Sequence, residues 1–458
     1  MRVAILGGGL RALACAHYLL RDGCRPVILE PAGELEALAS PCARVASQWS
    51  AFDVFVTAQD AALAGLMAEL ELQAHVAWSP MPTELFLGGR LQPVAAWSDL
   101  ERLSGPTAGV RLRTVSSALR AEWMRPTANL AAVAADEWLS RRYGPDATAR
   151  LWRPLLDVLL GPGSGERVSA HRARLALRAV LGSEVGCRGD LPGGLAKLVH
   201  ALARSVVRRG GQIRLRHRIG RVSVGSDGLP VTHGELSETW DALILAGSTS
   251  DWSSRIDPAL RRSLAVQCEA AAEEPIELVS VVAFVRAPPR SAARVLLIDR
   301  DSEGACIVDP GPGPDGARSA IRPIYVTQRY AAGSARPPDS VVEKQARTSI
   351  VRALPIIRPE SIEDVSVHRL VIEERRWVAG PRSSRPARLP GCHPLYLCGA
   401  DQNPLRLPGP EASVMSAREV VGAALRDHSV RQASSHEVAV RTPARSSVAD
   451  ATLGGSEQ

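Results

Sequence analysis

The sequence predicts an α/β fold that contains more than one domain. Three observations support this prediction: a strand–glycine–helix–strand unit at the N-terminus, a length of 458 residues, and later apolar runs with both strand-like and helix-like spacing. A chain of this length exceeds what one simple hydrophobic core supports, so two domains are expected. Apolar residues make up 45% of the chain, as in ordinary soluble globular proteins.

The first segment of the chain carries the pattern of a dinucleotide-binding unit. Residues 3–6 form a short apolar run expected to be a buried strand, three glycines follow directly, and residues 10–21 have helical spacing. Gly23 is expected to end that helix, and a second strand is expected over residues 26–29. Strand, glycines, helix and a closing acid, in this order, predict a βαβ unit that binds a nucleotide cofactor.

Each part of this unit has a physical role. The glycines let the backbone turn tightly beside a pyrophosphate, and the helix N-terminus presents free N–H groups and a positive dipole end to it. The acid at the strand end accepts hydrogen bonds from ribose hydroxyls and favours a ribose without a phosphate. Ala12 stands where the third glycine of the pattern usually falls, which the pattern allows. The predicted cofactor-binding residues of this unit are Gly7, Gly8, Gly9, Leu10, Arg11 and Glu30.

The charge of the chain does not indicate a nucleic-acid-binding protein. The formal net charge is +7, but arginine supplies nearly all of the positive side, and the only lysines are Lys197 and Lys344. The basic residues are scattered, without a long stripe, so we expect solvated surface arginines and no nucleic-acid partner. The preference for arginine and alanine is typical of a GC-rich, bacterial-type genome.

The cysteines and the apolar runs favour a cytoplasmic protein. The eight cysteines form no C-x-x-C pair, and their spacing predicts neither a metal site nor a disulfide framework, so we expect thiols in a reducing compartment. A strand that begins at residue 3 leaves no room for a signal peptide, and no apolar run reaches the roughly 18 residues of a membrane span. Peripheral contact with a membrane surface stays open.

The middle of the chain is expected to hold a second domain inserted into the first. Residues 52–72 have helical spacing, and residues 84–95 predict a hairpin that turns at Gly88–Gly89. Residues 98–179 are mostly helical in pattern. The segment GDLPGGLAKL, residues 189–198, introduces a helix expected to run to about Arg209.

The rest of the chain mixes strands and helices. Strands are expected over residues 212–215, 219–224, 229–233, 241–247 and 395–397, with several more between residues 275 and 330. Helices are expected over residues 340–354 and 412–425. Residues 429–458 are polar and lack periodicity, which predicts a disordered tail.

Four segments together resemble the FAD-dependent oxidoreductases. They are the N-terminal unit, GDLPGGLAKL, the strand ending near Ala246, and the closing YLCGADQ…EASVMSAREVVGAAL. The chain is most similar to the group of phytoene and squalene-type desaturases, protoporphyrinogen oxidase and flavin amine oxidases. Residues 136–144 and 151–161 resemble the helical segment of the substrate domain in its desaturase-like branch, and the likeness extends over roughly residues 1–427.

The resemblance implies a fold and its division. It implies a Rossmann-type FAD-binding domain, glutathione-reductase-like, with an inserted α+β substrate domain. The FAD-binding domain would comprise residues 1–75, 189–250 and 386–428. The substrate domain would comprise residues 76–188, mainly helical, and residues 251–385, a sheet plus a helix, with the tail at residues 429–458.

The resemblance also implies further FAD contacts. Asp401, after Gly399, would bond the ribityl chain, and the backbone of Ser413–Val414 at a helix N-terminus would lie beside the flavin ring. The backbone of Ile219 would meet the adenine. As alternatives, Asp401 is a loop or capping acid, and Ile219 is an ordinary strand residue. Ala246 completes the set of cofactor-binding residues.

Two departures from the family pattern bear on FAD binding. The family usually carries R-x-G-G just after the ribose acid, where this sequence has Glu34, Leu35, Glu36 and Ala37. Carboxylates in place of neutral or positive groups near a pyrophosphate weaken its binding. Arg11 or Arg44 would then have to supply the positive charge. In the last helix, Ser416–Ala417 replaces a common Ser-Gly pair.

The residues favour dehydrogenation or desaturation of a small apolar substrate over amine oxidation. Neither lysine lies where amine oxidases place theirs, and LRLPGPEASV lacks their aromatic residues. The sequence indicates no particular catalytic residue. The polar candidates of the second domain are Arg153, His171, Arg172 and Arg174, and Trp123, Trp138 and Trp152 are core or pocket-wall residues.

Three alternatives remain at this stage: a flavin amine oxidase, an NAD-dependent enzyme with the same βαβ unit, and a non-catalytic relative that keeps the fold as a binding module. The matching C-terminal segment disfavours the NAD-dependent enzyme, and Glu34, Glu36 and Ala37 support the non-catalytic one. Substrate identity, electron acceptor and oligomeric state stay open.

Overall fold

The structure is a computed structural model of the chain. It describes residues 1–35, 50–53, 55–94, 99, 102–103, 128–181, 187–247, 255–258, 260, 273–286, 292–298, 304–311, 321–331, 336–375, 394–399 and 409–441.

The N-terminal part of the fold is a sheet of five parallel strands. In spatial order they are β17 (Leu395–Leu397), β11 (Ala242–Leu245), β1 (Arg2–Leu6), β2 (Arg25–Leu29) and β7 (Gln212–Arg214). β1 lies at the centre and is buried from its second residue onward, as its continuous apolar run predicts. Three separate stretches of the chain therefore contribute to one sheet.

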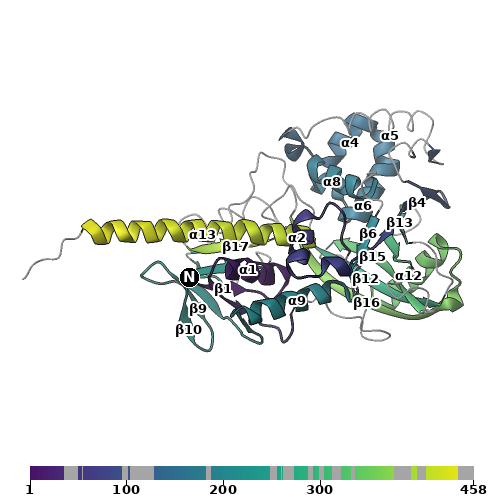
Figure 1. Cartoon of the computed structure of the whole chain (residues 1–458). Coiled ribbons are helices and arrows are strands. Elements are labelled where there is room, and N and C mark those ends of the chain that lie inside the picture. The colour runs from purple at the N-terminus through teal and green to yellow at the C-terminus, as the bar shows by residue number, and fades with distance from the viewer. Residues whose placement is uncertain are drawn as a thin grey trace, which may run out of the picture.

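Helices cover one face of this sheet and a small sheet covers the other. The helices are α1 (Leu10–Arg21), α2 (Ala61–Glu69), α9 (Gly194–Arg208) and α13 (Pro410–Arg441), whose apolar sides share one hydrophobic core with the sheet. The opposite face packs against the three-stranded antiparallel sheet of β8 (Arg221–Val224), β9 (Pro230–His233) and β10 (Ser237–Thr239). Figure 1 shows α13 crossing this layer and projecting beyond it.

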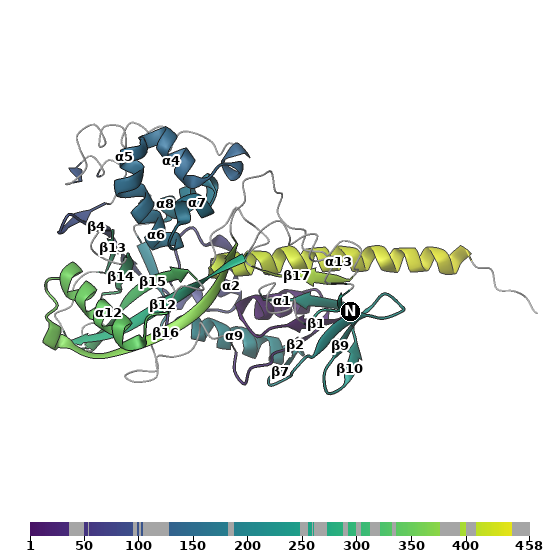
Figure 2. The same ribbon diagram turned by 180° about the vertical axis from the view of Figure 1, so that it is seen from behind.

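A second, mixed sheet of seven strands forms the other half of the molecule (Figure 2). In spatial order its strands are β16 (Ile362–Arg375), β12 (Glu273–Arg286), β15 (Ile321–Ala331), β14 (Ala305–Asp309), β13 (Ala293–Leu297), β4 (Thr83–Leu87) and β5 (Arg90–Pro93). One face packs against α12 (Asp339–Ala353) through alternate residues of the strands, such as Val279 and Val281.

The other face of the second sheet meets a helical group. Its main helices are α4 (Ala135–Tyr143), α6 (Arg153–Leu160) and α8 (Ala170–Leu181), joined by α5 (Pro145–Ala147), the turn Thr148–Trp152 and α7 (Ser164–Arg167). They share a core with Leu85 and Leu296 of the sheet. β3 (Ala77–Pro80) and β6 (Cys187–Asp190) pair as a short antiparallel ribbon. The helical pattern predicted over residues 98–179 is confirmed where it is described.

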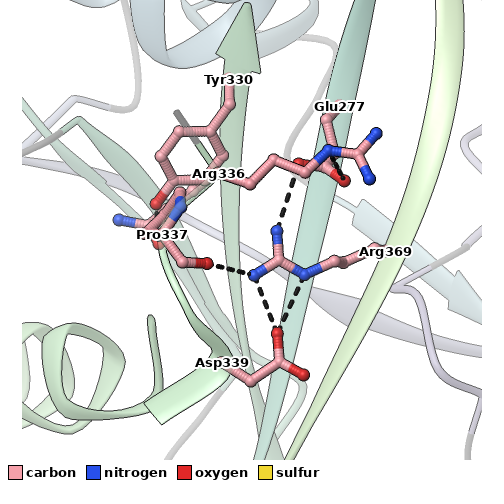
Figure 3. Close-up of polar contacts among 7 residues, drawn as sticks. Glu277, Tyr330, Arg336, Pro337, Asp339 and Arg369 are labelled. Carbon is pink, nitrogen blue, oxygen red and sulfur yellow. Dashed lines mark hydrogen bonds and ion pairs between the residues drawn. The ribbon is translucent and has the colours of Figure 1, made fainter. Parts of the chain in front are cut away.

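An ion-pair network around one buried carboxylate, Glu277, attaches the start of α12 to the second sheet (Figure 3). Arg369 on β16 donates to Glu277 on β12 at 3.1 Å, to the Pro337 carbonyl at 2.7 Å and to Asp339 at 2.8 Å. Arg336 lies 3.4 Å from the other oxygen of Glu277. Because Glu277 is only 3% exposed, these partners compensate a carboxylate that is nearly removed from water.

Two sequence expectations are corrected. The helix expected over residues 52–72 is shorter, because Val56 instead exchanges backbone hydrogen bonds with Gly189 and the chain turns at Thr57–Asp60. Asp60 accepts hydrogen bonds from the N–H and hydroxyl of Thr57, and α2 begins at the next residue. The last helix is longer than expected and runs to Arg441, so residues 429–441 are helical and not part of a disordered tail.

No helix among the described residues is long and apolar enough to cross a bilayer. Of the cysteines, Cys15, Cys24 and Cys398 are buried free thiols. The sulfur atoms of Cys15 on α1 and Cys398 after β17 lie 3.7 Å apart, where the first helix packs on the last strand.

Candidate cofactor site

The candidate site lies at the carboxyl edge of the five-stranded sheet. The chain leaves β1 toward β2 on one side, while β11 pairs with β1 on the other. In parallel sheets a ligand binds outside the carboxyl ends of the strands where the strand order reverses. The residues after β1, β11 and β17 meet at this place, and they include most of the predicted cofactor-binding positions.

Gly7 makes a close approach between two strand ends possible. Its φ of +116° belongs to a region that side-chain-bearing residues avoid. A methyl group at this position would lie 2.4 Å from the carbonyl oxygen of Ala246, which follows β11. The Gly7 N–H donates to the Leu29 carbonyl at 3.0 Å and the Ala246 N–H to that of Leu6 at 2.9 Å, so three strand ends are held together.

Gly8 keeps the space beside Glu30 open. A methyl group there would lie 2.8 Å from the Glu30 carboxylate and 3.0 Å from the side chain of Leu35. One oxygen of Glu30 accepts the Ala32 N–H at 2.7 Å, which orients the carboxylate at the end of β2. The other oxygen lies beside the glycine turn, as a ribose acceptor requires.

Helix N-termini converge on the same edge. α1 follows β1, α13 follows β17, and α9 runs into β7, so all three helices begin at the carboxyl ends of the strands. Gly9 and Gly193, the residues preceding α1 and α9, provide no side-chain cap. The positive dipole ends of these helices therefore lie at the carboxyl edge of the sheet, where they favour an anion.

Arg11 contributes an unsatisfied donor to the start of α1. Its Nε is buried and makes no hydrogen bond within the described chain. An orphaned guanidinium nitrogen two residues after the glycine turn fits a pyrophosphate oxygen as its partner. Of the two arginines considered from the sequence, Arg44 lies outside the described residues.

The start of α13 is attached to the end of β17. The Ser416 hydroxyl donates to the Gly399 carbonyl at 3.2 Å, and the Ser413 hydroxyl donates to the Gly409 carbonyl at 3.0 Å. Val414 is fully buried in the core beneath the first turn. Gly399, Ser413 and Val414 are thus brought to one place, whereas Asp401 lies outside the described residues.

The predicted adenine position lies across the sheet from α1. Ile219 is 3% exposed and packs with Leu6 and Leu29 on the face that β8–β10 cover. Its own peptide groups make no hydrogen bond to the described part of the chain. Such a backbone is available to a ligand, so the position accords with the predicted role without testing it.

Of the four residues that replace the family's R-x-G-G pattern, the structure describes the first two. Glu34 is exposed, and Leu35, which stands at the variable position of the pattern, lies beside the glycine turn. Glu36 and Ala37 lie outside the described residues.

Sequence reasoning missed Glu411, in the first turn of α13. Its two carboxylate oxygens accept the N–H groups of Ala62 at 3.0 Å and Leu63 at 2.7 Å, at the start of α2. One carboxylate therefore fixes the first turns of two helices relative to each other. An acid in the first turn of a helix is a weak signal in sequence, because it does not reveal which helix end it caps.

The polar candidates of the second domain are not gathered at one site. Arg153 pairs with Asp136 at an exposed position of the helical group. His171, Arg172 and Arg174 are half-buried on α8, and Trp152 is fully buried in the helical core with Trp138 beside it. Trp123 lies outside the described residues. Lys344 is exposed on α12, and Lys197 is half-buried on the first turn of α9.

The arrangement fits a dinucleotide cofactor. It provides a glycine turn at a helix N-terminus, a carboxylate at the neighbouring strand end, and an unsatisfied arginine nitrogen at the helix start. In agreement with this, residues 52–403 match the model of the flavin-containing amine oxidoreductases, which is more than half of the 458 residues. No curated protein matches the sequence.

Solved structures with the same fold cover nearly the whole chain. A provisional protoporphyrinogen oxidase from Exiguobacterium sp. 255-15 has a TM-score of 0.66 at 16% identity, over 92% of this chain and 98% of its own. Cyclohexylamine oxidase from Brevibacterium oxydans IH-35A has a TM-score of 0.65 at 16% identity, over 93% and 99%. Putrescine oxidase bound to putrescine has a TM-score of 0.64 at 13% identity, over 93% and 99%. At these identities the likeness concerns the fold.

Proposed function

Since the chain belongs to the family of flavin-containing amine oxidoreductases, whose cofactor is FAD, we propose that it dehydrogenates or desaturates a small apolar substrate. FAD supplies the hydride acceptor of such a reaction when it is bound. The residues of the chain then have to hold the cofactor, exclude water and position the substrate.

The carboxyl edge of the five-stranded sheet supports the cofactor part of this proposal. Gly7, Gly8 and the first turn of α1 would hold the pyrophosphate, with Arg11 as a charged donor. Glu30 would accept hydrogen bonds from the ribose hydroxyls. The first turn of α13 would present its N–H groups to the flavin.

The substrate part is supported by an apolar wall on the second sheet. Val282, Phe284 and Tyr325 lie on the face turned away from α12, where they pack with Met81 and Val308. Phe55 packs against the same cluster and belongs to the segment that leads into α2. These side chains are buried, and the wall borders the place where the second sheet meets the cofactor-binding half, so a substrate bound there would meet apolar side chains.

Amine oxidation is the second candidate, because the matching family model and two of the similar structures are those of amine oxidoreductases. The scarcity of lysine speaks against it. Lys344 is exposed on α12, on the far side of the second sheet, and Lys197 is the only other lysine in the chain.

An absorbance spectrum of the purified protein tests the cofactor part. We expect oxidised-flavin bands that are released on denaturation and restored by added FAD. A colourless protein that cannot be reconstituted would favour a non-catalytic relative instead. In that case the triple change Glu34→Arg, Glu36→Gly and Ala37→Gly should recover flavin binding.

Anaerobic bleaching of the flavin band tests the substrate part. We expect reduction by members of a panel of apolar compounds that includes alkenes, cyclic hydrocarbons and apolar carboxylates, and none by primary or secondary amines. Bleaching by amines alone would replace the proposal with amine oxidation.

A further inference from the structure

One buried charge in the described chain lacks an ionic partner. The buried charged residues are Arg188, Glu277, Arg294, Asp309 and Arg322. Arg322 pairs with Asp309 at 3.0 Å, and Glu277 pairs with Arg369 at 3.1 Å. Arg188 pairs with Asp53 and Asp190, both at 2.7 Å. Arg294 forms no ion pair among the described residues, although it is only 8% exposed.

Arg294 has few contacts that could satisfy a guanidinium. It lies on β13, on the face of the second sheet turned away from α12. Its Nη1 donates to the carbonyl of Ala179, near the end of α8, over a long 3.4 Å. Its remaining N–H groups make no hydrogen bond to the described chain, and burial lowers its pKa, which the neighbouring Asp53 only partly offsets. A buried guanidinium is expected to have a charged partner, because it has lost its hydration.

The nearby carboxylates are already committed to another arginine. The guanidinium carbon of Arg188 lies 4.8 Å from the centroid of the Phe55 ring, and that of Arg294 lies 5.4 Å from the same centroid. Asp53 and Asp190 are both directed to Arg188, and despite burial they raise the pKa of Arg188. Cys306, which also lies close to Arg294, is kept neutral because burial raises its pKa.

Arg294 lies next to the apolar wall. Phe55 packs with that cluster, and so does Cys306. The chain continues from Phe55 into α2, whose first turn is bound by Glu411 of α13. Arg294 therefore lies beside the buried apolar side chains of the wall at the junction of the two halves, and a substrate bound at this junction would have both as neighbours.

We propose that Arg294 binds a carboxylate carried by the substrate, which is then an apolar monocarboxylate. The inference rests on the proposed function, since it assigns the substrate class of the same enzyme. A planar guanidinium matches a carboxylate through two parallel N–H···O bonds. A single unpaired guanidinium compensates one negative charge, which favours a carboxylate over a phosphate dianion.

Binding of octanoate, compared with neutral octanamide of the same chain length, tests the assignment without turnover. Equilibrium dialysis of the purified protein, with FAD added, measures both dissociation constants. We expect octanoate to bind at least about tenfold more tightly than octanamide, as a charge-assisted hydrogen-bonded pair predicts. In Arg294→Met this preference should disappear. Arg294→Lys, which keeps the charge without the planar fork, should retain part of it and serves if the methionine variant does not fold.

Arg352→Met is the matched control, because Arg352 lies 4.9 Å from the Phe86 ring at the opposite face of the same sheet. It should keep the octanoate preference of the wild type. A wild type without that preference, or a preference that survives in Arg294→Met, would overturn the assignment. The flavin spectrum tests the enzyme class separately. A flavin-loaded protein without the preference therefore contradicts only this inference, and a flavin-free protein with an Arg294-dependent preference contradicts only the proposed function.

Discussion

Replacing Gly7 with alanine is expected to weaken FAD binding while the protein still folds. Gly7 has a φ of +116°, and a methyl group on it would lie 2.4 Å from the Ala246 carbonyl oxygen. This oxygen belongs to the backbone directly after β11, so it cannot rotate away as the end of a side chain could. The ends of β1 and β11 would have to separate at the site where the cofactor is expected.

Gly7→Ala is expected to have two separate effects, one on folding stability and one on the affinity for FAD. An alanine held in this backbone region costs about 1–3 kcal/mol of folding free energy. Relief of the contact needs a displacement of about 1 Å, judged from ordinary non-bonded separations. Such a shift removes one or two N–H bonds to the pyrophosphate, at about 1–1.5 kcal/mol each. FAD should therefore bind roughly 10- to 100-fold more weakly.

Gly23→Ala separates backbone strain from the contact. Gly23 also has a positive φ, +73°, but a methyl group there has no neighbour within 4 Å. This control should lose about 1–2 kcal/mol of stability and bind FAD as the wild type does. Fluorescence titration of the apoproteins with FAD measures binding, and urea unfolding measures stability. If Gly7→Ala bound FAD with the wild-type dissociation constant, the glycine turn would not be the pyrophosphate site.

Three further changes test other parts of the structure. Arg369→Met should lower the free energy of unfolding by about 1.5–3 kcal/mol in urea denaturation, because buried Glu277 loses the closer of its two arginine partners and keeps only Arg336. Arg286→Met, which removes the exposed ion pair with Glu363, should lower it by at most about 1 kcal/mol. Glu411→Ala should cost about 1–2 kcal/mol and speed hydrogen exchange at the first amides of α2, and unchanged exchange there would contradict the capping role. Burial raises the pKa of Tyr18 to about 12, above its value of about 10 in the unfolded chain, so its contribution to stability is complete below pH 10 and is lost as the pH rises toward 12. Tyr18→Phe should flatten that alkaline loss in unfolding measurements, and an equal loss in both proteins would refute the assignment.

Local patterns predicted the first part of the fold well. The order of apolar run, glycines, helical spacing and acid at the N-terminus specified β1, α1, β2 and the position of Glu30, and the structure places Gly7, Gly8 and Glu30 side by side. The hairpin at Gly88–Gly89 followed from its turn residues. These elements depend on interactions between residues that are close in sequence.

Elements that depend on distant partners were missed or misjudged. β16 is a long strand that was not predicted, and it is stabilised by pairing with β12, nearly a hundred residues earlier. The start of α2 was placed too early, because Val56 pairs with Gly189 and Glu411 caps the helix from the other end of the chain. Residues 429–441 are polar, but they continue a helix whose buried first turns have already nucleated it.

The sequence by itself determined the family resemblance and the glycine turn, because both are carried by residue types at fixed short spacing. Only the tertiary structure decided which charges have partners. Asp53, Arg188 and Arg294 are far apart in the chain, and nothing local shows that both nearby carboxylates face Arg188 and leave Arg294 unpaired. Ion pairing in a core depends on which side chains the packing brings within a few ångströms, and that is a property of the whole fold.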